Sequence, residues 1–598
     1  MLTYTVRPHP EIHLYEVALR LQAAQLGSSQ SIVAASWTTG SYLMREFASK
    51  IRAIHAVSLR TQLPIRVERL EKARWRIHTE SLAADDEIEI RWQTFAFSLG
   101  IHDAWLDRDR GFINPAALYV FPQDAAPNEP VTLIFEAPGY EVLCALPESD
   151  QSGAYIADSL ERFLDSPAHL IGPNARCCRF STTVCGTAHE ILITGVSSIN
   201  IARLREDFEK IFETVIRFWS PQQAQAPFKR YLLSLHLAPN LYGGLEHAEG
   251  TVLLHDPKAV PAEGEADVPK DYVDLLTLVA HEYFHAWLVK RIRPDAFVPY
   301  DLTREAYTPD LWLYEGFTSY YESRLPFEAG LLKRSDWCKA FGERLSAALS
   351  REGFDRMTLA ESSLAAWVKL YRQCADSPYS QTSYYSKGAL LAFILDRKIR
   401  ALTSGGRSLD DVLRGLYQEY LDAEALKQYA GLPAGQLANA IRRYAGCNLD
   451  SLLEALTVTE NAHGIWQAEL KEALASLNLS LEVDPAVPSS FRFAGLRAGA
   501  RSDEKVILQY VPSDSPAFAA GLFAGDELIA VDGDRTTASS LNRQIERLRG
   551  RSAEVLWFRT DRVMRGMLDL RLPLSDAFLA RLPKKIVEAD LADQNSEG

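Results

Sequence analysis

Short runs in which apolar and polar residues alternate recur through the first 168 residues of the chain. Three of them cover residues 16–21, 31–37 and 87–92. A period of two, with turn residues between the runs, is typical of strands that bury one face of a sheet. The pattern therefore predicts an N-terminal β-sandwich-like domain over residues 1–168.

The pattern changes in the middle of the chain. Residues 169–334 combine strand-like runs with a long apolar run over residues 273–280, which has the character of a helix. Between residues 335 and 480 the apolar residues recur at helical spacing, for example in residues 386–396. We predict a mixed domain over residues 169–334 and an α-helical domain over residues 335–480.

The last quarter of the chain is again rich in strand-like runs. Residues 482–490 contain two prolines and two serines and indicate a linker. A compact β-rich module follows, and we place this domain at residues 481–576 and a polar C-terminal tail at residues 577–598. A chain of 598 residues is too long for one hydrophobic core, so the prediction is a multidomain α+β protein.

Composition and charge exclude one class of partner. The hydrophobic fraction of 47% and the charged fraction of 24% are those of an ordinary globular protein. The net charge is −14, and no basic tract interrupts the acidic surplus. Such a surface repels phosphate backbones, so we expect no nucleic-acid partner. It could favour cationic ligands such as peptide amines.

The compartment is predicted from the N-terminus and the cysteines. The first ten residues lack the basic and apolar segments of a signal peptide, and no run of about 18 apolar residues could span a bilayer. The seven cysteines form no CxxC pair, which indicates neither a disulfide framework nor a thiolate zinc site. We predict a cytoplasmic location, with the periplasm as the alternative if a signal was removed.

The most informative motif is His281-Glu282-Tyr283-Phe284-His285, an HExxH sequence at the end of the apolar run. Two histidines four residues apart lie on one face of a helix, so both imidazoles can reach one metal ion. The intervening glutamate projects beside the metal, where it can take a proton from water. The alternative is a buried helix whose two histidines are only hydrogen-bonded.

A catalytic zinc site normally has three protein ligands, so a carboxylate should complete this one. Glu315 stands among aromatic residues in the sequence Leu-Trp-Leu-Tyr-Glu-Gly-Phe, residues 311–317. A glutamate on such a face is costly to bury unless it is paired or bound to metal, and this cost favours Glu315 as the third ligand. It could instead be an acid on a helix surface, and Glu305 and Glu322 are the next candidates.

The segments around these candidate ligands resemble a known family. Residues 311–317 are similar to the zinc-glutamate segment of gluzincin aminopeptidases such as aminopeptidase N. The longer gap between His285 and Glu315, together with residues 285–294, resembles the glycyl aminopeptidase family more closely. The resemblance implies a thermolysin-like gluzincin catalytic domain, one Zn²⁺ per chain and a C-terminal PDZ domain. Residues 36–47 are also similar to that family, with no chemistry to assign to them.

The sequence Gly243-Gly244-Leu245-Glu246-His247 resembles the GGLEH segment of the same family. In related enzymes this glutamate binds the free α-amino group, and the resemblance implies that role for Glu246. A glycine pair lets the backbone approach a substrate, and a carboxylate binds an ammonium by charge-assisted hydrogen bonds. A glycine-rich turn with an incidental acid is the alternative. Aminopeptidase N has asparagine where this chain has His247.

The sequence Tyr384-Tyr385-Ser386-Lys387-Gly388 resembles the family's YxKG element. The resemblance implies that a tyrosine stabilises the tetrahedral intermediate, with Tyr385 as the match by register and Tyr384 as the other possibility. A phenol can donate a hydrogen bond to a developing oxyanion. Without the resemblance, adjacent tyrosines would indicate only packing.

Residues 515–533 resemble a PDZ domain through the pattern SPAxxAGLxxGDxLxxVDG. PDZ domains bind an extended peptide as an added strand. The resemblance implies a loop for the peptide carboxylate near residues 493–496, with Gly495 and Leu496 as binding residues and a C-terminal peptide as a possible partner. The alternative is a module that packs within the chain and has no free ligand.

The leading hypothesis is a zinc aminopeptidase that acts on peptides with a free N-terminus. Water is activated at His281, His285 and Glu315, and Glu282 is the general base. The resemblance implies a preference for small N-terminal residues such as glycine or alanine. Two alternatives are a zinc endopeptidase, which would have no use for Glu246, and a PDZ-based adaptor with a degenerate peptidase domain.

Overall fold

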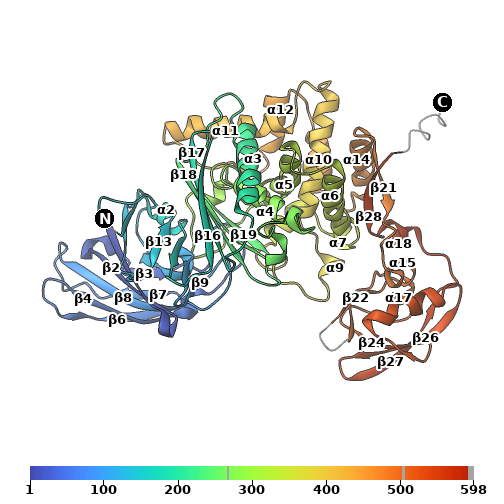
Figure 1. Ribbon diagram of the computed structural model, residues 1–598, viewed down its shortest axis with the longest axis horizontal. Coiled ribbons are helices and arrows are strands. Elements are labelled where there is room, and N and C mark those ends of the chain that lie inside the picture. The colour runs from blue at the N-terminus through green and yellow to red at the C-terminus, as the bar shows by residue number, and fades with distance from the viewer. Residues whose placement is uncertain (152, 266–267, 501–504, 590–598) are drawn as a thin grey trace. The chain divides into compact units, whose positions relative to one another are not determined.

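The computed structural model describes residues 1–151, 153–265, 268–500 and 505–589. Its internal contacts divide the chain into two compact units. The first comprises residues 1–308, 321–332 and 412–436, and the second comprises the remaining segments. Figure 1 follows the chain from the blue N-terminal strands to the red C-terminal module.

The N-terminal part of the first unit is built from β-sheets, as predicted. The largest has the strand order β14-β12-β1-β2-β8-β4-β5, and the predicted runs at residues 16–21 and 87–92 lie in its strands β2 and β8. Two four-stranded sheets accompany it, with the orders β13-β15-β10-β9 and β11-β3-β7-β6. The strands are β1 (Leu2–His9), β2 (Leu14–Gln22), β3 (Ser31–Ala34), β4 (Ile51–Ser58), β5 (Pro64–Ile65), β6 (Val67–Glu71), β7 (Arg74–Ile77), β8 (Glu87–Phe95), β9 (Ala104–Leu106), β10 (Arg110–Ile113), β11 (Val120–Pro122), β12 (Val131–Phe135), β13 (Glu141–Cys144), β14 (Ala154–Ala157) and β15 (Ala168–Ile171).

Aromatic side chains fill the interior beneath the largest sheet. Tyr4 lies against Trp92, Tyr119 and Phe163 with ring centroids 4.7–6.4 Å apart. Phe163 belongs to the short helix α2 (Leu160–Leu164), which ends at Asp165. The core therefore fixes the end of α2, where the Asp165 carboxylate lies.

A five-stranded mixed sheet forms the next layer of the first unit. Its order is β16-β17-β18-β20-β19, with β17, β18 and β20 parallel and β19 antiparallel at one edge. Helix α4 (Tyr272–Phe284) packs against β19, β20 and α3. The other elements are β16 (Cys177–Val184), β17 (Thr187–Thr194), α3 (Ile201–Trp219), β18 (Arg230–Leu237), β19 (Gly243–His247) and β20 (Gly250–His255).

The packing of the helical region differs from the predicted division. Residues 412–436, which include most of α11 (Leu409–Ala425), have their contacts with the first unit. There Tyr417 lies against Trp219, with ring centroids 5.7 Å apart. The predicted domain over residues 335–480 is therefore not one compact body, because α11 finds its apolar partners on α3.

The second unit begins with a group of helices. The longest are α6 (Arg334–Leu349), α10 (Tyr384–Leu402) and α14 (His463–Ala475), and α10 packs against both of the others. Shorter helices are α7 (Gly353–Arg356), α8 (Leu359–Leu364), α9 (Ser377–Ser380), α12 (Leu437–Ala445) and α13 (Asp450–Thr457). Apolar residues such as Phe393 and Ile394 on α10 are almost completely buried.

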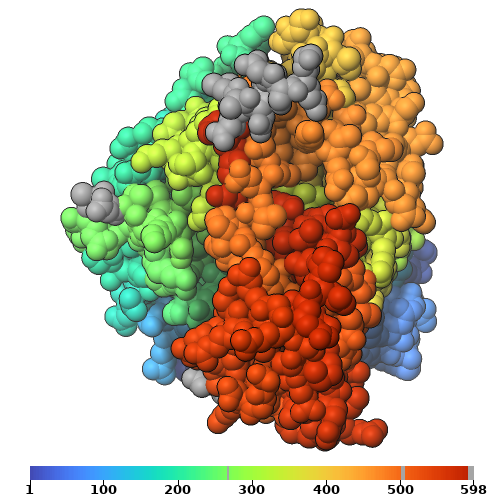
Figure 2. Space-filling model, turned by 90° about the vertical axis from the view of Figure 1, so that its right-hand side faces the viewer, coloured from blue at the N-terminus to red at the C-terminus, as the bar shows by residue number. Residues whose placement is uncertain are grey.

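A β-rich module ends the second unit, and Figure 2 shows its atoms gathered in orange and red. Its sheet has the order β22-β23-β24-β26-β27, with β25 beside β24. The elements are α15 (Ser489–Ala494), β22 (Arg497–Ala500), β23 (Val506–Tyr510), α16 (Pro516–Ala519), β24 (Glu527–Val531), β25 (Asp534–Arg535), α17 (Ala538–Arg547), β26 (Ser552–Arg559) and β27 (Arg562–Asp569). Residues such as Leu508, Val555 and Trp557 form a separate apolar core.

The end of the chain corrects one prediction. The polar tail expected at residues 577–598 begins too early, because residues up to Glu588 are folded. They contain part of α18 (Asp576–Ala580) and β28 (Lys584–Glu588), which pairs with β21 (Leu479–Val483). Phe578 and Ile586 are buried there. Residues 590–598 lie outside the described part of the chain.

Across the described residues, no helix has the length and apolar character needed to cross a membrane. All seven cysteines lie in described segments, and each is a free thiol.

Candidate active site

Helix α4 positions both histidines of the HExxH motif. His281 lies in its last turn, and His285 immediately follows its end. His281 Nδ1 lies 2.7 Å from Glu322 Oε2, and His285 Nδ1 lies 2.9 Å from the carbonyl oxygen of Leu288. The two Nε2 atoms lie 3.1 Å apart.

These contacts set the protonation of the imidazoles. An ionised carboxylate and a carbonyl oxygen only accept hydrogen bonds, so each Nδ1 must carry the proton. In the neutral ring Nε2 then holds a lone pair. Two lone pairs that face each other at 3.1 Å fit a shared metal ion, because the ion turns their repulsion into coordination.

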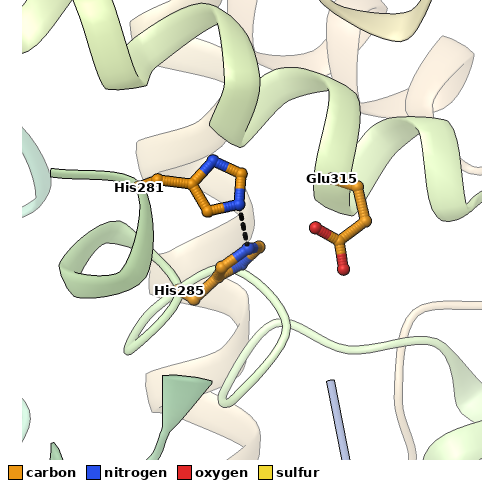
Figure 3. Close-up of side chains that lie close together, drawn as sticks. All are labelled: His281, His285 and Glu315. Carbon is orange, nitrogen blue, oxygen red and sulfur yellow. Dashed lines mark hydrogen bonds between the residues drawn. The ribbon is translucent and has the colours of Figure 1, made fainter. Parts of the chain in front are cut away.

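Glu315 supplies the third donor. One ligand atom from each of His281, His285 and Glu315 lies within 4.8 Å of the others, and the Glu315 carboxylate is directed toward the two imidazoles (Figure 3). Glu315 is only 2% exposed. Two nitrogens and one carboxylate oxygen are the donor set of catalytic zinc sites, so these residues could hold a metal.

The other candidate ligands have different places. Glu322 is the hydrogen-bond partner of His281, and Glu305 is not part of the potential metal group found among the described residues. Glu315 lies in a π-helical turn, η6 (Trp312–Gly316), which continues directly into α5 (Phe317–Glu328). Glu322 therefore follows Glu315 by about two helical turns, so one continuous helix carries both acids.

Glu282 lies against the backbone of β19. A Cβ atom added to Gly244 would be 2.0 Å from Glu282 Oε1. The absence of a side chain at Gly244 is therefore what allows the carboxylate to take this position. Glu282 is 5% exposed, and a carboxylate so placed beside two imidazoles can serve as a base.

Glu246 is also buried, with 3% of its surface exposed. Its Oε1 atom has no hydrogen-bond partner among the described residues. A buried carboxylate oxygen without a donor is costly, and a cationic ligand would relieve that cost. The Nδ1 atom of the next residue, His247, lies 3.1 Å from Asp165 Oδ1, so this histidine links β19 to the end of α2.

Two glycines bring the tyrosine pair close to Glu315. A Cβ atom on Gly316 would lie 2.5 Å from the Cα atom of Gly388 in α10, so η6 and α10 cross at nearly the closest distance possible. Tyr384 and Tyr385 begin α10, and their rings stack with centroids 4.7 Å apart. This crossing explains why a glycine follows the glutamate and why another follows the tyrosines.

The two tyrosines differ in exposure. Tyr384 is fully buried, whereas Tyr385 is partly exposed. Burial and then the negative charge of Glu315 raise the pKa of Tyr385 well above its ordinary value. Its phenol therefore stays protonated at neutral pH and remains a hydrogen-bond donor. Tyr371 contacts both, with its hydroxyl 3.2 Å from that of Tyr384 and 3.0 Å from that of Tyr385.

Comparison with known proteins addresses the same residues. The family model described as "M61 glycyl aminopeptidase" matches residues 274–391, which span His281, Glu315 and Tyr385. A second family model, described as "Peptidase M61 N-terminal domain", matches residues 3–171. In both segments the chain is similar to the M61 glycyl aminopeptidase family.

Two solved structures are similar to this chain to very different degrees. A crystal structure of an aminopeptidase N family protein from Idiomarina loihiensis has a TM-score of 0.87 and 28% sequence identity, and the match covers 99% of this chain and 98% of that chain. Native yeast LTA4 hydrolase has a TM-score of 0.46 and 13% identity, covering 77% of this chain and 67% of that chain. Comparison with curated proteins finds no match. The M61 match and the Idiomarina structure support a metallo-aminopeptidase.

The two residues predicted for peptide binding in the C-terminal module have different surroundings. Leu496 lines a groove of about 170 Å³ between β22 and α17, beside Ala498 and Leu541. Gly495 ends α15 with a φ of +78° and packs against Ser515, whose Cβ atom would be 2.3 Å from an added Cβ. The N–H groups of Gly495 and Leu496 both donate to carbonyls of α15.

Some contacts of the site could not be predicted from the sequence. The sequence indicated Glu322 as a substitute ligand, whereas the structure shows it bonded to His281. It gave no role to Tyr371 or to Gly40, and an added Cβ on Gly40 would be 2.2 Å from Glu246 Oε2. The similarity of residues 36–47 to the family was the one feature of the sequence that could have pointed to Gly40.

Proposed function

We propose that this protein is a zinc aminopeptidase that removes small N-terminal residues, glycine or alanine, from peptides. The observation that carries the proposal is the convergence of His281, His285 and Glu315 beside Glu282. The small-residue preference is supported by the description of the family that the chain matches.

The three ligands would hold one Zn²⁺ per chain. When bound, zinc polarises a substrate carbonyl and lowers the pKa of water. The protein supports this site through Glu322 and the Leu288 carbonyl, which orient the imidazoles. Such outer partners fix the ring tautomer and raise the basicity of the ligand nitrogen.

The remaining residues handle the protons and the substrate. Glu282 takes a proton from the attacking water and delivers it to the leaving amine. Tyr385 donates a hydrogen bond to the carbonyl oxygen as negative charge develops there, and its partial exposure favours it over the buried Tyr384. Glu246 binds the α-ammonium of the substrate. Gly243 and Gly244 allow the peptide backbone to lie close to β19.

The proposal also covers the C-terminal module, which we assign as a PDZ domain. The groove beside β22, lined by Leu496, suits an extended peptide added as a strand. Gly495 would shape its end without donating a hydrogen bond, because its N–H is bonded to Phe491.

A specific observation supports the alternative in which this module packs within the chain. The hydroxyl of Tyr379 donates to the Val511 carbonyl and accepts from the Val511 N–H. The N–H and hydroxyl of Ser513 both donate to the Glu352 carboxylate. These contacts, of which those of Tyr379 are buried, hold the module against α7 and α9.

Metal analysis joined to activity tests the proposed function. Purified wild type should contain one zinc per chain and cleave glycyl- and alanyl-p-nitroanilide. His285→Ala and Glu315→Ala should lose both zinc and activity, whereas Glu305→Ala should keep both. A wild-type protein that is active without any bound metal would overturn the proposal. Full zinc with cleavage only of internal peptide bonds would instead establish an endopeptidase.

A further inference from the structure

The segment at residues 36–47 forms a tight turn in the N-terminal domain. Thr38 pairs with Ser41, whose N–H donates to the Thr38 carbonyl at 3.1 Å. Gly40 lies in this turn with a φ of +85°, a conformation that favours glycine. The preceding Trp37 is completely buried and donates to the carbonyls of residues 301 and 304. The turn is therefore anchored through Trp37.

Gly40 lies directly against the Glu246 carboxylate. A Cβ atom at Gly40 would be 2.2 Å from Oε2 and 2.4 Å from Oε1. Real Cβ atoms essentially never come closer than 3.0 Å to such atoms, so no residue with a side chain fits here unless the carboxylate moves. The backbone of Gly40 thus forms one wall of the space that the Glu246 carboxylate occupies.

The neighbouring Thr39 connects this turn to a buried ion pair. Its hydroxyl donates to Asp165 Oδ1 at 2.8 Å. The Lys290 ammonium donates to the same hydroxyl at 2.8 Å and to Asp165 Oδ1 at 2.9 Å. Each group is at most slightly exposed, so the contacts are protected from water and have a defined geometry.

The same aspartate also holds the strand that carries Glu246. Asp165 lies 3.1 Å from His247 Nδ1 and accepts from the Ala248 N–H at 2.8 Å. The turn and the end of β19 are therefore attached to one carboxylate. This shared attachment fixes the position of Gly40 relative to Glu246.

Charge supports the arrangement. Burial alone would lower the pKa of Lys290, but the negative charges of Asp165 and Glu246 raise it above its ordinary value. Lys290 consequently stays an ammonium. Val289, just before it, has a φ of +90°. Such a conformation is strained for a β-branched residue and occurs where the chain turns after His285.

We propose that the turn at Thr38–Ser41 is a positioning element of the substrate-amine site, with Gly40 as its wall and Thr39 as its anchor to Lys290 and Asp165. The N-terminal domain thereby takes part in selecting peptides that have a free α-ammonium. This inference rests on the proposed role of Glu246. It gives residues 36–47 a function and makes Gly40 and Thr39 determinants of specificity.

Gly40→Ala tests the wall, and Gly139→Ala is its matched control. Gly139 has a φ of +86°, and an added Cβ there would meet nothing within 4 Å. Both variants strain the backbone equally, but only Gly40→Ala displaces Glu246. For alanyl-p-nitroanilide, Gly40→Ala should raise KM and lower kcat/KM about 100-fold. Its preference for the free amine over the N-acetyl form should fall, while Gly139→Ala keeps the wild-type values.

Thr39 offers a second, milder test. Thr39→Val removes the hydroxyl at constant shape and should lower kcat/KM about tenfold through KM. Thr39→Ser keeps the hydroxyl and should restore the wild-type preference for the free amine. If Gly40→Ala fails to fold, this pair decides the question.

The outcomes separate the inference from the proposed function. If wild type does not prefer free amines, the proposed role of Glu246 is wrong and the inference falls with it. If wild type does prefer them, but Gly40→Ala matches Gly139→Ala or Thr39→Val matches Thr39→Ser, only the positioning role is overturned.

Discussion

Gly244→Ala should lower the activity about 100-fold by displacing Glu282, the proposed general base, while leaving the fold intact. The added Cβ would lie 2.0 Å from Glu282 Oε1, and real Cβ contacts are essentially never below 3.0 Å. The oxygen must therefore withdraw by about 1 Å, a displacement that can cost about 100-fold in rate. Gly244 does not have a left-handed φ, so alanine can adopt its backbone conformation.

The effect should appear in kcat. A 100-fold loss corresponds to about 2.7 kcal/mol of transition-state stabilisation. KM should also rise, but by a smaller factor, because Gly244 is one of the two glycines that let the substrate backbone lie close to β19 while the Glu246 carboxylate itself is unchanged. Steady-state hydrolysis of alanyl-p-nitroanilide measures both constants, and metal analysis should show normal zinc. Gly100→Ala is the control, since its Cβ would be 3.5 Å from the nearest atom, an ordinary contact.

A double variant sharpens this test. If Gly244→Ala acts only through Glu282, it should cost nothing further in a Glu282→Ala background, because both changes remove the same base. An additive loss in the double variant, or a single variant with wild-type kcat, would show that the steric reasoning is wrong.

Three further predictions address the metal, the tyrosine and the stability of the fold. Glu322→Ala should weaken zinc binding about 10- to 100-fold by releasing His281 Nδ1, as measured by competition with a chelator. Tyr385→Phe should lower kcat about 100-fold with little change in KM, and Tyr384→Phe should have a smaller effect in the same assay. Burial lowers the pKa of His189 from 6.5 to about 4, so the folded protein keeps it neutral. Its contribution to stability is complete above pH 6.5 and is lost as the pH falls toward 4, about 2 kcal/mol by pH 5. Denaturant unfolding between pH 6.5 and 5 measures this slope.

Each of these has its own contradicting result. Equal zinc affinity in Glu322→Ala and wild type would show that the hydrogen bond to His281 does not tune the site. A larger loss in Tyr384→Phe than in Tyr385→Phe would exchange their roles. For stability, His189→Gln should reduce the slope of the unfolding free energy against pH by about one proton. An unchanged slope would show that His189 is not the source of the pH dependence.

The grouping of His281, His285 and Glu315, which could hold a metal, could be predicted because its information is local. His281 and His285 lie four residues apart in a run that is otherwise apolar, and that spacing determines the shared face of a helix. The choice of Glu315 rested on the cost of burying a carboxylate among aromatic residues, and the structure finds it 2% exposed. The role of Glu322 as the hydrogen-bond partner of His281 could not be predicted from the sequence, because a nearby carboxylate can either bind the metal or bond to a residue that binds it.

Other features depend on contacts between distant parts of the sequence. Gly40 meets Glu246 although about 200 residues separate them, and no periodicity records that approach. The strand Lys584–Glu588 was taken for part of a polar tail, since its partner is Leu479–Val483 and its own sequence has only a short alternation. The return of residues 412–436 to the first unit was hidden for the same reason, because helical spacing does not identify the surface that a helix covers.

The measurement that tests the central claim most directly compares glycyl- and alanyl-p-nitroanilide with their N-acetylated forms, using zinc-loaded wild type, chelator-treated protein and Glu282→Ala. A zinc aminopeptidase should cleave only the free amines, and both treatments should abolish that cleavage. Cleavage of free and acetylated forms at similar rates, or activity that survives in Glu282→Ala, would contradict it.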